Sequence, residues 1–180
     1  MKFIETELRG AFIIEPERIE DERGFFARVW CQKELKAAGL DTRQAQCNMS
    51  FNKYKNTIRG MHYQKSPHEE IKIVRCINGA IYDIIIDLRP NSPTYMKWRG
   101  FDLTQENRRM LYIPKGFAHG YQTLDNETEI FYQVSEFYSP KAEHGIRWDD
   151  AAFSIKWRPY EKLIISEKDK HWDNYLPLKK

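Results

Sequence analysis

The segment Thr57-Ile58-Arg59-Gly60-Met61-His62-Tyr63-Gln64 carries a guanidinium, an imidazole and a phenol close together. Its alternating pattern predicts a strand, because successive side chains of a strand point to opposite faces. On this pattern His62 shares a face with Gly60, and Arg59 lies on the other face. A histidine centred in such a strand, near an arginine, suggests a base beside a bound anion. The alternative is a core histidine whose ring is satisfied by a backbone carbonyl.

Short strands are predicted on both sides of this segment. Apolar or aromatic runs separated by polar turns predict strands at 11–15, 25–30, 44–50, 58–64, 71–76, 80–88, 97–103, 110–113, 120–123 and 128–137. Helical segments are predicted only at 32–39 and at 166–170, and the dipeptide Asn78-Gly79 predicts a tight hairpin. The pattern has no alternation of strands with helices, so it favours an all-β sandwich or barrel in a single domain. The segment from residue 138 onward is expected to wrap over this body.

Two of the predicted strands carry polar groups among apolar neighbours. Asp83 falls on the same face as Ile81 and Ile85, and a carboxylate on an apolar face needs a partner. Lys72, across the predicted hairpin, is a candidate partner, and the alternative is that this face is solvated. Tyr132 also shares a face with apolar residues, where a tyrosine is commonly a core residue with its hydroxyl bonded.

Charge and cysteine content narrow the class of protein. The chain has 180 residues and a formal net charge of +3, with acidic and basic residues interspersed, which argues against a nucleic-acid binder and leaves room for one anionic-ligand site. Its three cysteines are far apart and form no paired motif, which favours a reducing compartment, the cytoplasm. Residues 1–7 lack the apolar stretch of a signal peptide, and the apolar run around 84–86 is too short to span a membrane.

The histidines do not form a metal-binding motif. None of His62, His68, His119, His144 and His171 is spaced as in known zinc motifs, so no metal is expected. The segment 114–120 is interpreted as a turn that carries a histidine between small residues. The chain also lacks a nucleophile elbow, a phosphate-binding P-loop and a dinucleotide fingerprint. Histidine, tyrosine, lysine and arginine remain, a set suited to proton chemistry on an anionic substrate without a cofactor.

Five segments, taken together and in order, closely resemble the dTDP-4-dehydrorhamnose 3,5-epimerase family. They are 21–26 (DERGFF), 59–64 (RGMHYQ), 113–120 (IPKGFAHG), 145–150 (GIRWDD) and 166–169 (SEKD). The resemblance implies a cupin-like double-stranded β-helix, or jelly roll, with short peripheral helices. It implies one epimerase domain over 1–180, with a jelly-roll core at about 40–137 and wrapping terminal segments. It also implies a metal-free homodimer that takes a dTDP-linked nucleotide sugar.

The resemblance assigns roles to individual residues. His62 matches the general base, Asp169 the carboxylate that pairs with it, Tyr132 the general acid and Lys72 the cation that steadies an enolate oxygen. The positions that match the substrate-binding set are Arg23, Gln46, Asn48, Arg59, His119, Tyr138, Glu143 and Lys168. The implied reaction inverts C3 and C5 of dTDP-4-keto-6-deoxyglucose and gives dTDP-4-keto-L-rhamnose. A 4-keto sugar suits this chemistry, because the ketone accepts the charge when C3 or C5 loses its proton.

Departures from the family pattern keep other functions open. Arg28 and Glu70 stand where the family commonly has a glutamate and a glutamine, respectively. The first alternative is an epimerase acting at C3 only or C5 only, or a related ketoisomerase, on another nucleotide-linked 4-keto sugar. Two further alternatives are a sugar-binding jelly roll without activity and a metal-dependent cupin oxygenase.

Overall fold

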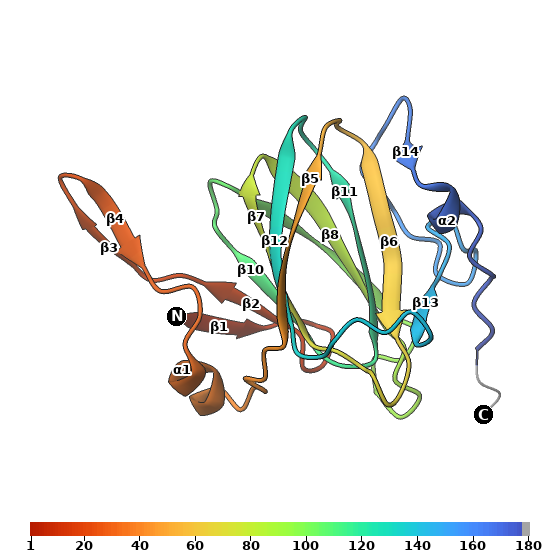
Figure 1. The fold of residues 1–180 in the computed structure, drawn as a ribbon, viewed down its shortest axis with the longest axis horizontal. Coiled ribbons are helices and arrows are strands. Elements are labelled where there is room, and N and C mark those ends of the chain that lie inside the picture. The colour runs from red at the N-terminus through yellow and green to blue at the C-terminus, as the bar shows by residue number, and fades with distance from the viewer. Residues whose placement is uncertain (178–180) are drawn as a thin grey trace.

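Two β-sheets face each other and form the body of the molecule (Figure 1). The computed structural model describes residues 1–177. The first sheet has the strand order β1-β2-β10-β7-β12-β5, with β1 Lys2–Glu5, β2 Phe12–Glu15, β10 Met110–Ile113, β7 Lys72–Asn78, β12 Thr128–Val134 and β5 Gln46–Asn52. The second has the order β13-β6-β11-β8-β9, with β13 Glu143–Gly145, β6 Thr57–Gln64, β11 Phe117–Thr123, β8 Ala80–Asp87 and β9 Trp98–Thr104.

The remaining elements lie at the margins of the two sheets. β14 Ile164–Ile165 pairs parallel with β6, and all other pairings are antiparallel among the described residues. β3 Arg18–Asp21 and β4 Gly24–Ala27 form a hairpin that projects from the body (Figure 1). The helices are α1 Gln32–Ala37 and α2 Glu167–Lys170, and no helix within residues 1–177 is long and apolar enough to cross a membrane. The all-β prediction is therefore confirmed, although β1, β3, β13 and β14 were not predicted, because all four are short.

The predicted hairpin at Asn78-Gly79 is wrong. β7 and β8 belong to different sheets, so the dipeptide carries the chain across the interior instead of turning it back on itself. Gly79 has a φ of +75°, and a Cβ there would lie 2.7 Å from Thr128 Oγ1. Its N–H donates to Gln105 Oε1 at 3.1 Å. The chain does bend at Gly79, but tertiary packing decides that the strands on its two sides do not pair with each other.

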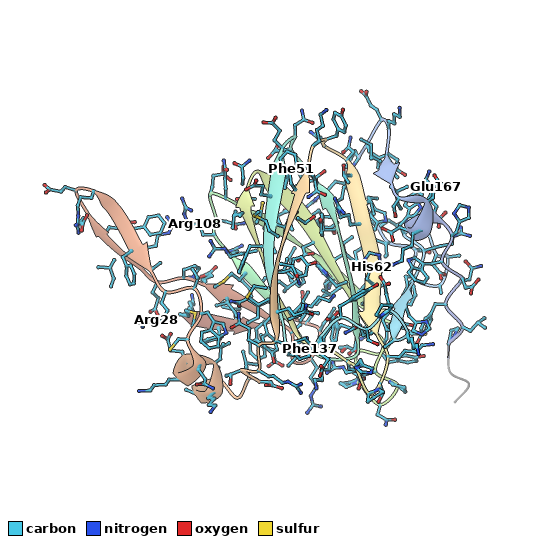
Figure 2. All side chains as sticks on the ribbon, in the orientation of Figure 1. Arg28, Phe51, His62, Arg108, Phe137 and Glu167 are labelled. Carbon is cyan, nitrogen blue, oxygen red and sulfur yellow. The ribbon has the colours of Figure 1, made fainter. Side chains whose placement is uncertain are left out.

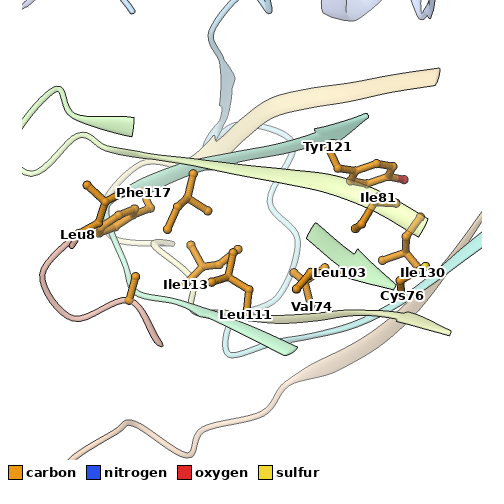
Figure 3. Close-up of a cluster of buried hydrophobic side chains, with 12 residues drawn as sticks. Leu8, Val74, Cys76, Ile81, Leu103, Leu111, Ile113, Phe117, Tyr121 and Ile130 are labelled. Atoms are coloured by element: carbon orange, nitrogen blue, oxygen red, sulfur yellow. The ribbon is translucent and has the colours of Figure 1, made fainter. Parts of the chain in front are cut away.

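An apolar cluster fills one part of the space between the sheets (Figure 3). Its buried members are Leu8, Ala11, Val74, Cys76, Ile81, Ile85, Leu103, Leu111, Ile113, Phe117, Tyr121 and Ile130. None of them comes from β5 or β6, whose inward side chains are mostly polar. Burying each large aliphatic side chain stabilises the fold by about 1.5–3 kcal/mol. The apolar part of the interior thus supports a polar part along β5 and β6.

Two further clusters cover the outer faces of the sheets. The first sheet is covered by α1, whose Leu35 packs with Ile73 and Met110. The second sheet is covered by the chain after β13, which contributes Phe153 and Trp157 to the cluster around Tyr82 and Ile84. The C-terminal segment is therefore packed onto the back of β6, β8 and β11, and this packing determines where α2 lies.

Candidate active site

A cavity of about 360 Å³ opens between the two sheets at the polar part of the interior. It is lined by residues of β5, β6, β7, β12 and β13 and of the segments beside them. These residues are Gln46, Asn48, His62, Tyr63, Gln64, Glu70, Lys72, Tyr132, Val134, Tyr138 and Glu143. His62 comes from the second sheet and Tyr132 from the first, so the cavity lies between these two side chains.

A β-bulge in β6 sets the direction of its side chains. His62 is opposite His119 and Arg59 is opposite Tyr121, with a register shift between the two pairs. Because His119 and Tyr121 share a face of β11, His62 and Arg59 also share a face of β6. The prediction that they lie on opposite faces is wrong, since it assumed unbroken alternation. Gly60 makes the close approach possible, because a Cβ there would lie 2.4 Å from the Gly120 Cα.

His62 is paired with Asp169, 107 residues further along the chain. His62 Nε2 lies 2.6 Å from Asp169 Oδ1, and the side chains are 33% and 5% exposed, respectively. Asp169 lies on α2, and its backbone N–H donates to the capping hydroxyl of Ser166. Because Nε2 is taken by the carboxylate, Nδ1 is left as the basic nitrogen.

The surroundings of Asp169 keep its carboxylate ionised. Burial alone would raise the pKa of Asp169, but the hydrogen bond and charge of His62 and the backbone N–H of Gly60 lower it below the ordinary value for an aspartate. The Gly60 N–H lies 3.3 Å from Oδ2. An ionised carboxylate on one imidazole nitrogen fixes the tautomer and stabilises the imidazolium that forms when the other nitrogen takes a proton.

Lys72 and Tyr132 lie on adjacent strands and line the same cavity. Lys72 Nζ is 2.6 Å from Glu70 Oε1, in an ion pair whose side chains are 13% and 10% exposed. Burial and the charge of Glu70 raise the pKa of the Tyr132 hydroxyl, and they outweigh the opposite effect of Arg59. Tyr132 is thus kept protonated beside a cation, as a proton donor requires.

The outer part of the cavity is a network of polar side chains. The Tyr138 hydroxyl donates to Glu143 Oε2 at 2.7 Å, and Lys168 Nζ donates to Glu143 Oε1 at 2.6 Å. Gln46 Oε1 accepts the Tyr138 backbone N–H at 2.8 Å. Asn48 lies two residues further along β5 and also lines the cavity. These five residues were all selected from the sequence, and the structure brings them together.

Arg59 and His119 are close to the cavity but are not among its lining residues. Arg59 donates from Nε to Asn52 Oδ1 at 2.7 Å. His119 Nε2 lies 2.5 Å from Oδ1 of the fully buried Asp83. The partner of Asp83 is therefore His119 and not Lys72, because β7 and β8 are in different sheets. His119 also lies inside β11, and the interpretation of 114–120 as a turn is wrong beyond Gly116.

Arg23 lies apart from all of these residues. It occupies the turn between β3 and β4, is 84% exposed and pairs with Asp21. Arg28, next to the same hairpin, pairs with Glu34 at 3.2 Å. In Figure 2, Arg28 and Arg108 lie toward the hairpin, whereas His62 and Glu167 lie at the opposite side of the view. Within one chain, Arg23 therefore does not reach the cavity that contains His62.

Four lining residues were not selected from the sequence: Tyr63, Gln64, Glu70 and Val134. Gln64 was detectable, because a strand that aims His62 inward also aims the residue two positions on. Its side-chain oxygen accepts the Ser139 backbone N–H at 2.6 Å, which anchors the segment after β12. Glu70 precedes β7, where no periodic pattern indicates its direction. Within residues 1–177, no group of three or more histidine, cysteine or acidic residues is placed to hold a metal ion.

The sequence matches the dTDP-4-dehydrorhamnose 3,5-epimerase family over residues 5–176. The chain belongs to this family. The epimerase of Methanothermobacter thermautotrophicus is 43% identical over 173 residues, which cover 95% of this chain and 92% of the relative. The resemblance seen in the sequence is confirmed, and with it the isomerase class of enzyme.

Solved structures of family members superpose closely on this chain. The epimerase of Bacillus anthracis, solved with TDP and pyrophosphate bound, has a TM-score of 0.93 and 41% identity, covering 97% of this chain and 99% of its own. The epimerase of Legionella pneumophila, solved with dTDP-4-keto-L-rhamnose, has a TM-score of 0.90 and 35% identity, covering 96% and 92%. The predicted jelly-roll fold is confirmed by this likeness to the epimerases.

Proposed function

We propose that this epimerase converts dTDP-4-keto-6-deoxyglucose into dTDP-4-keto-L-rhamnose by inverting C3 and C5. The observation that carries the proposal is the His62–Asp169 pair at one wall of the cavity, with Tyr132 and Lys72 at the other. Inversion requires a base on one face of the sugar ring and an acid on the other. His62 and Tyr132 come from opposing sheets and meet this requirement.

Each step moves one proton off a carbon and one proton onto it. Nδ1 of His62 takes the proton from C3, and the C–H bonding electrons form an enolate with its charge on the C4 oxygen. The ammonium of Lys72 stabilises that oxygen. The Tyr132 hydroxyl then delivers a proton to the opposite face of C3, and the carbonyl forms again. Solvent then takes the proton from the His62 imidazolium and returns one to the Tyr132 phenolate, and the same sequence at C5 completes the reaction without a cofactor.

The outer network is proposed to bind the nucleotide. Tyr138 is 58% exposed and offers a ring face on which a thymine can stack. Gln46 and Asn48 supply amide groups beside it, and Lys168 supplies a cation for the diphosphate. Lys168 is held by Glu143, so its charge is partly compensated until a diphosphate replaces that carboxylate. Arg59 and His119 would contact the sugar end from deeper in the interior.

We also propose that the working unit is a homodimer. The β3–β4 hairpin exposes Ile19 (70%) and Phe26 (65%), and β5 exposes Met49 (67%) and Phe51 (52%). Exposed apolar side chains on a projecting hairpin and on β5, the edge strand of the first sheet, are typical of an interface. A second copy would cover them, and Arg23 would then reach the cavity of that second copy.

Three free cysteines support a reducing compartment, the cytoplasm, as the location.

The family match over residues 5–176 supports a single epimerase domain over 1–180, with a jelly-roll core at about 40–137. Residues 178–180 lie outside the described part of the chain.

Proton NMR of dTDP-4-keto-6-deoxyglucose in D2O tests the activity. Loss of both the C3 and the C5 proton signals is expected. Loss of one signal would instead indicate an epimerase of a single carbon, and no exchange would contradict the proposed substrate. His62→Ala is expected to abolish exchange, and full turnover in that variant would contradict the assigned base. His171→Ala is the matched control, because His171 is an exposed histidine that does not line the cavity.

Mixing two impaired variants tests the dimer. Arg23→Ala and His62→Ala homodimers are each expected to be impaired. Co-refolding them at equal concentration is expected to restore about one quarter of the wild-type activity, since about half of the dimers then contain one complete site. Sedimentation as a monomer at micromolar concentration would contradict the dimer.

A further inference from the structure

Trp172 lies beside the His62–Asp169 pair, immediately after α2. Its ring contacts the His62 ring edge to face, with centroids 6.4 Å apart and an interplanar angle of 70°. Lys168 Nζ lies 5.5 Å from the centre of the indole. Neither the motifs of the sequence nor the lining of the cavity assigns a role to this residue.

The space for the ring is provided by Gly145. This glycine of β13 is opposite His62 in the sheet. A Cβ on Gly145 would lie 2.1 Å from Trp172 Cε2 and 2.2 Å from its Nε1. The indole therefore lies against bare backbone directly beside His62. Position 145 must be a glycine because a side chain would occupy the space of the ring. The backbone conformation at Gly145 would itself allow other residues.

The indole N–H of Trp172 is buried but makes no hydrogen bond to any of residues 1–177. A buried tryptophan usually finds an acceptor for this group, because leaving it unpaired costs about 1–3 kcal/mol. The nearby acceptor is the Asp169 carboxylate. Burial has the largest effect on the pKa of Asp169 and raises it, and His62 has the next largest effect and lowers it. The Trp172 N–H is among the groups that lower this pKa further.

We propose that Trp172 is a positioning residue for the catalytic pair, whose indole N–H donates to the Asp169 carboxylate and whose ring excludes water from the outer side of the pair. The carboxylate is then held by His62, Gly60 and Trp172 from three directions. The inference rests on the proposed function for the role of His62 as the base.

The indole N–H of Trp172 would change how strongly Asp169 holds a proton on the His62 ring. A donor on the carboxylate draws negative charge away from the imidazole and fixes the carboxylate rotamer. Without the N–H, the carboxylate holds a proton on its partner ring more strongly, so the base becomes free only at higher pH. The other charged groups facing the pair, Lys168 and Glu143, are bonded to each other and keep their charges when Trp172 is changed.

Trp172→Phe tests the N–H while keeping an aromatic ring. The acidic limb of kcat/KM is expected to move to higher pH, and kcat to fall about three- to tenfold, the effect of about one hydrogen bond. KM is expected to stay near the wild-type value. The matched control is Trp157→Phe, which removes an indole N–H that donates to Trp148 O at 2.8 Å in the outer cluster. It is expected to lower the melting temperature without moving the pH profile.

If Trp172→Phe lowers only the melting temperature and its pH profile superposes on that of the wild type, Trp172 is a structural anchor and the proposal fails. A second measurement does not depend on activity and separates this failure from that of the proposed function. In 1H–15N spectra the indole signal of Trp172, assigned with Trp172→Phe, is expected to move in Asp169→Asn, whereas the signal of Trp157 stays.

Should Asp169→Asn not fold, the same signal is followed in the wild-type protein as pH is lowered. It is expected to move as Asp169 takes a proton. If the chemical shift of the Trp172 indole changes neither in Asp169→Asn nor when Asp169 is protonated, the proposal is overturned.

Discussion

His62–Asp169 and His119–Asp83 are histidine–carboxylate pairs of almost equal length that differ in construction. His62 Nε2 lies 2.6 Å from Asp169, and His119 Nε2 lies 2.5 Å from Asp83. The His62 side chain is 33% exposed, whereas that of His119 is 11% exposed. Asp83 and His119 come from neighbouring strands, so the sheet itself builds their pair. Asp169 reaches His62 only because the C-terminal segment is packed on the second sheet.

The difference separates a reactive pair from a supporting one. A base must meet its substrate, so its ring needs an open nitrogen at a cavity wall, which His62 has. Asp83 is fully buried, and its Oδ2 has no hydrogen-bond partner among residues 1–177. We therefore expect the His62–Asp169 pair to govern the rate of the reaction, and we expect Asp83 to govern stability by holding His119 in place. The following changes test this division.

Asp169→Asn is expected to have the largest effect, a fall of kcat by about 10³–10⁴ with KM little changed. An amide cannot fix the productive tautomer of His62 or stabilise its charged form. Steady-state kinetics of solvent exchange measure the effect. The control is Asp102→Asn, which removes an exposed carboxylate paired with Arg158 away from the cavity. A loss of less than about tenfold in Asp169→Asn would argue against the assigned pair.

Asp83→Asn is expected to lower the free energy of unfolding by about 3 kcal/mol, because it breaks a buried pair. For a chain of this length that corresponds to a fall in melting temperature of about 6–12 °C. Urea unfolding at one fixed protein concentration measures the change in the free energy of unfolding. Asp149→Asn, at an exposed carboxylate, is the control. A variant that melts like the wild type but is inactive would move His119–Asp83 into the catalytic machinery.

Glu70→Gln sharpens the comparison within the cavity and is expected to have a smaller effect. Burial is the main cause of the raised pKa of Tyr132, and the charge of Glu70 is the second. Removing that charge lowers the pKa of the phenol, so the alkaline limb of kcat should move to lower pH. The pH–rate profile measures the shift, with Glu161→Gln on the exposed C-terminal segment as control. An unmoved alkaline limb would exclude Tyr132 as the group that titrates there.

The smallest effect is expected in how the free energy of unfolding depends on pH in the acid range, through ionisation of Asp169. The pKa of Asp169 is lower in the folded protein than in the unfolded chain, so ionisation of this group stabilises the fold above its unfolded pKa of about 3.9. That contribution is lost as pH falls through the lowered folded value. The stability difference between the wild type and Asp169→Asn should therefore be full at neutral pH and vanish in strong acid. A difference that persists there would contradict the shift.

The sequence by itself determined the class of fold and most of the site. Period-two alternation and polar turns identified most of the strands, because successive side chains of a strand point to opposite faces. The resemblance to the family assigned His62, Lys72, Tyr132 and Asp169. In the structure the first three of these residues line one cavity, and Asp169 is bonded to His62.

Tertiary structure alone decided which strands pair and which way some side chains point. The glycine at 79 connects two sheets, so Asp83 meets His119 and not Lys72. The bulge at Gly60 turns Arg59 to the face of His62, which alternation alone does not predict. Trp172 gains its position from the bare backbone of Gly145, 27 residues earlier in the chain. These contacts depend on long-range packing, whereas a local sequence pattern specifies only the conformation of its own segment.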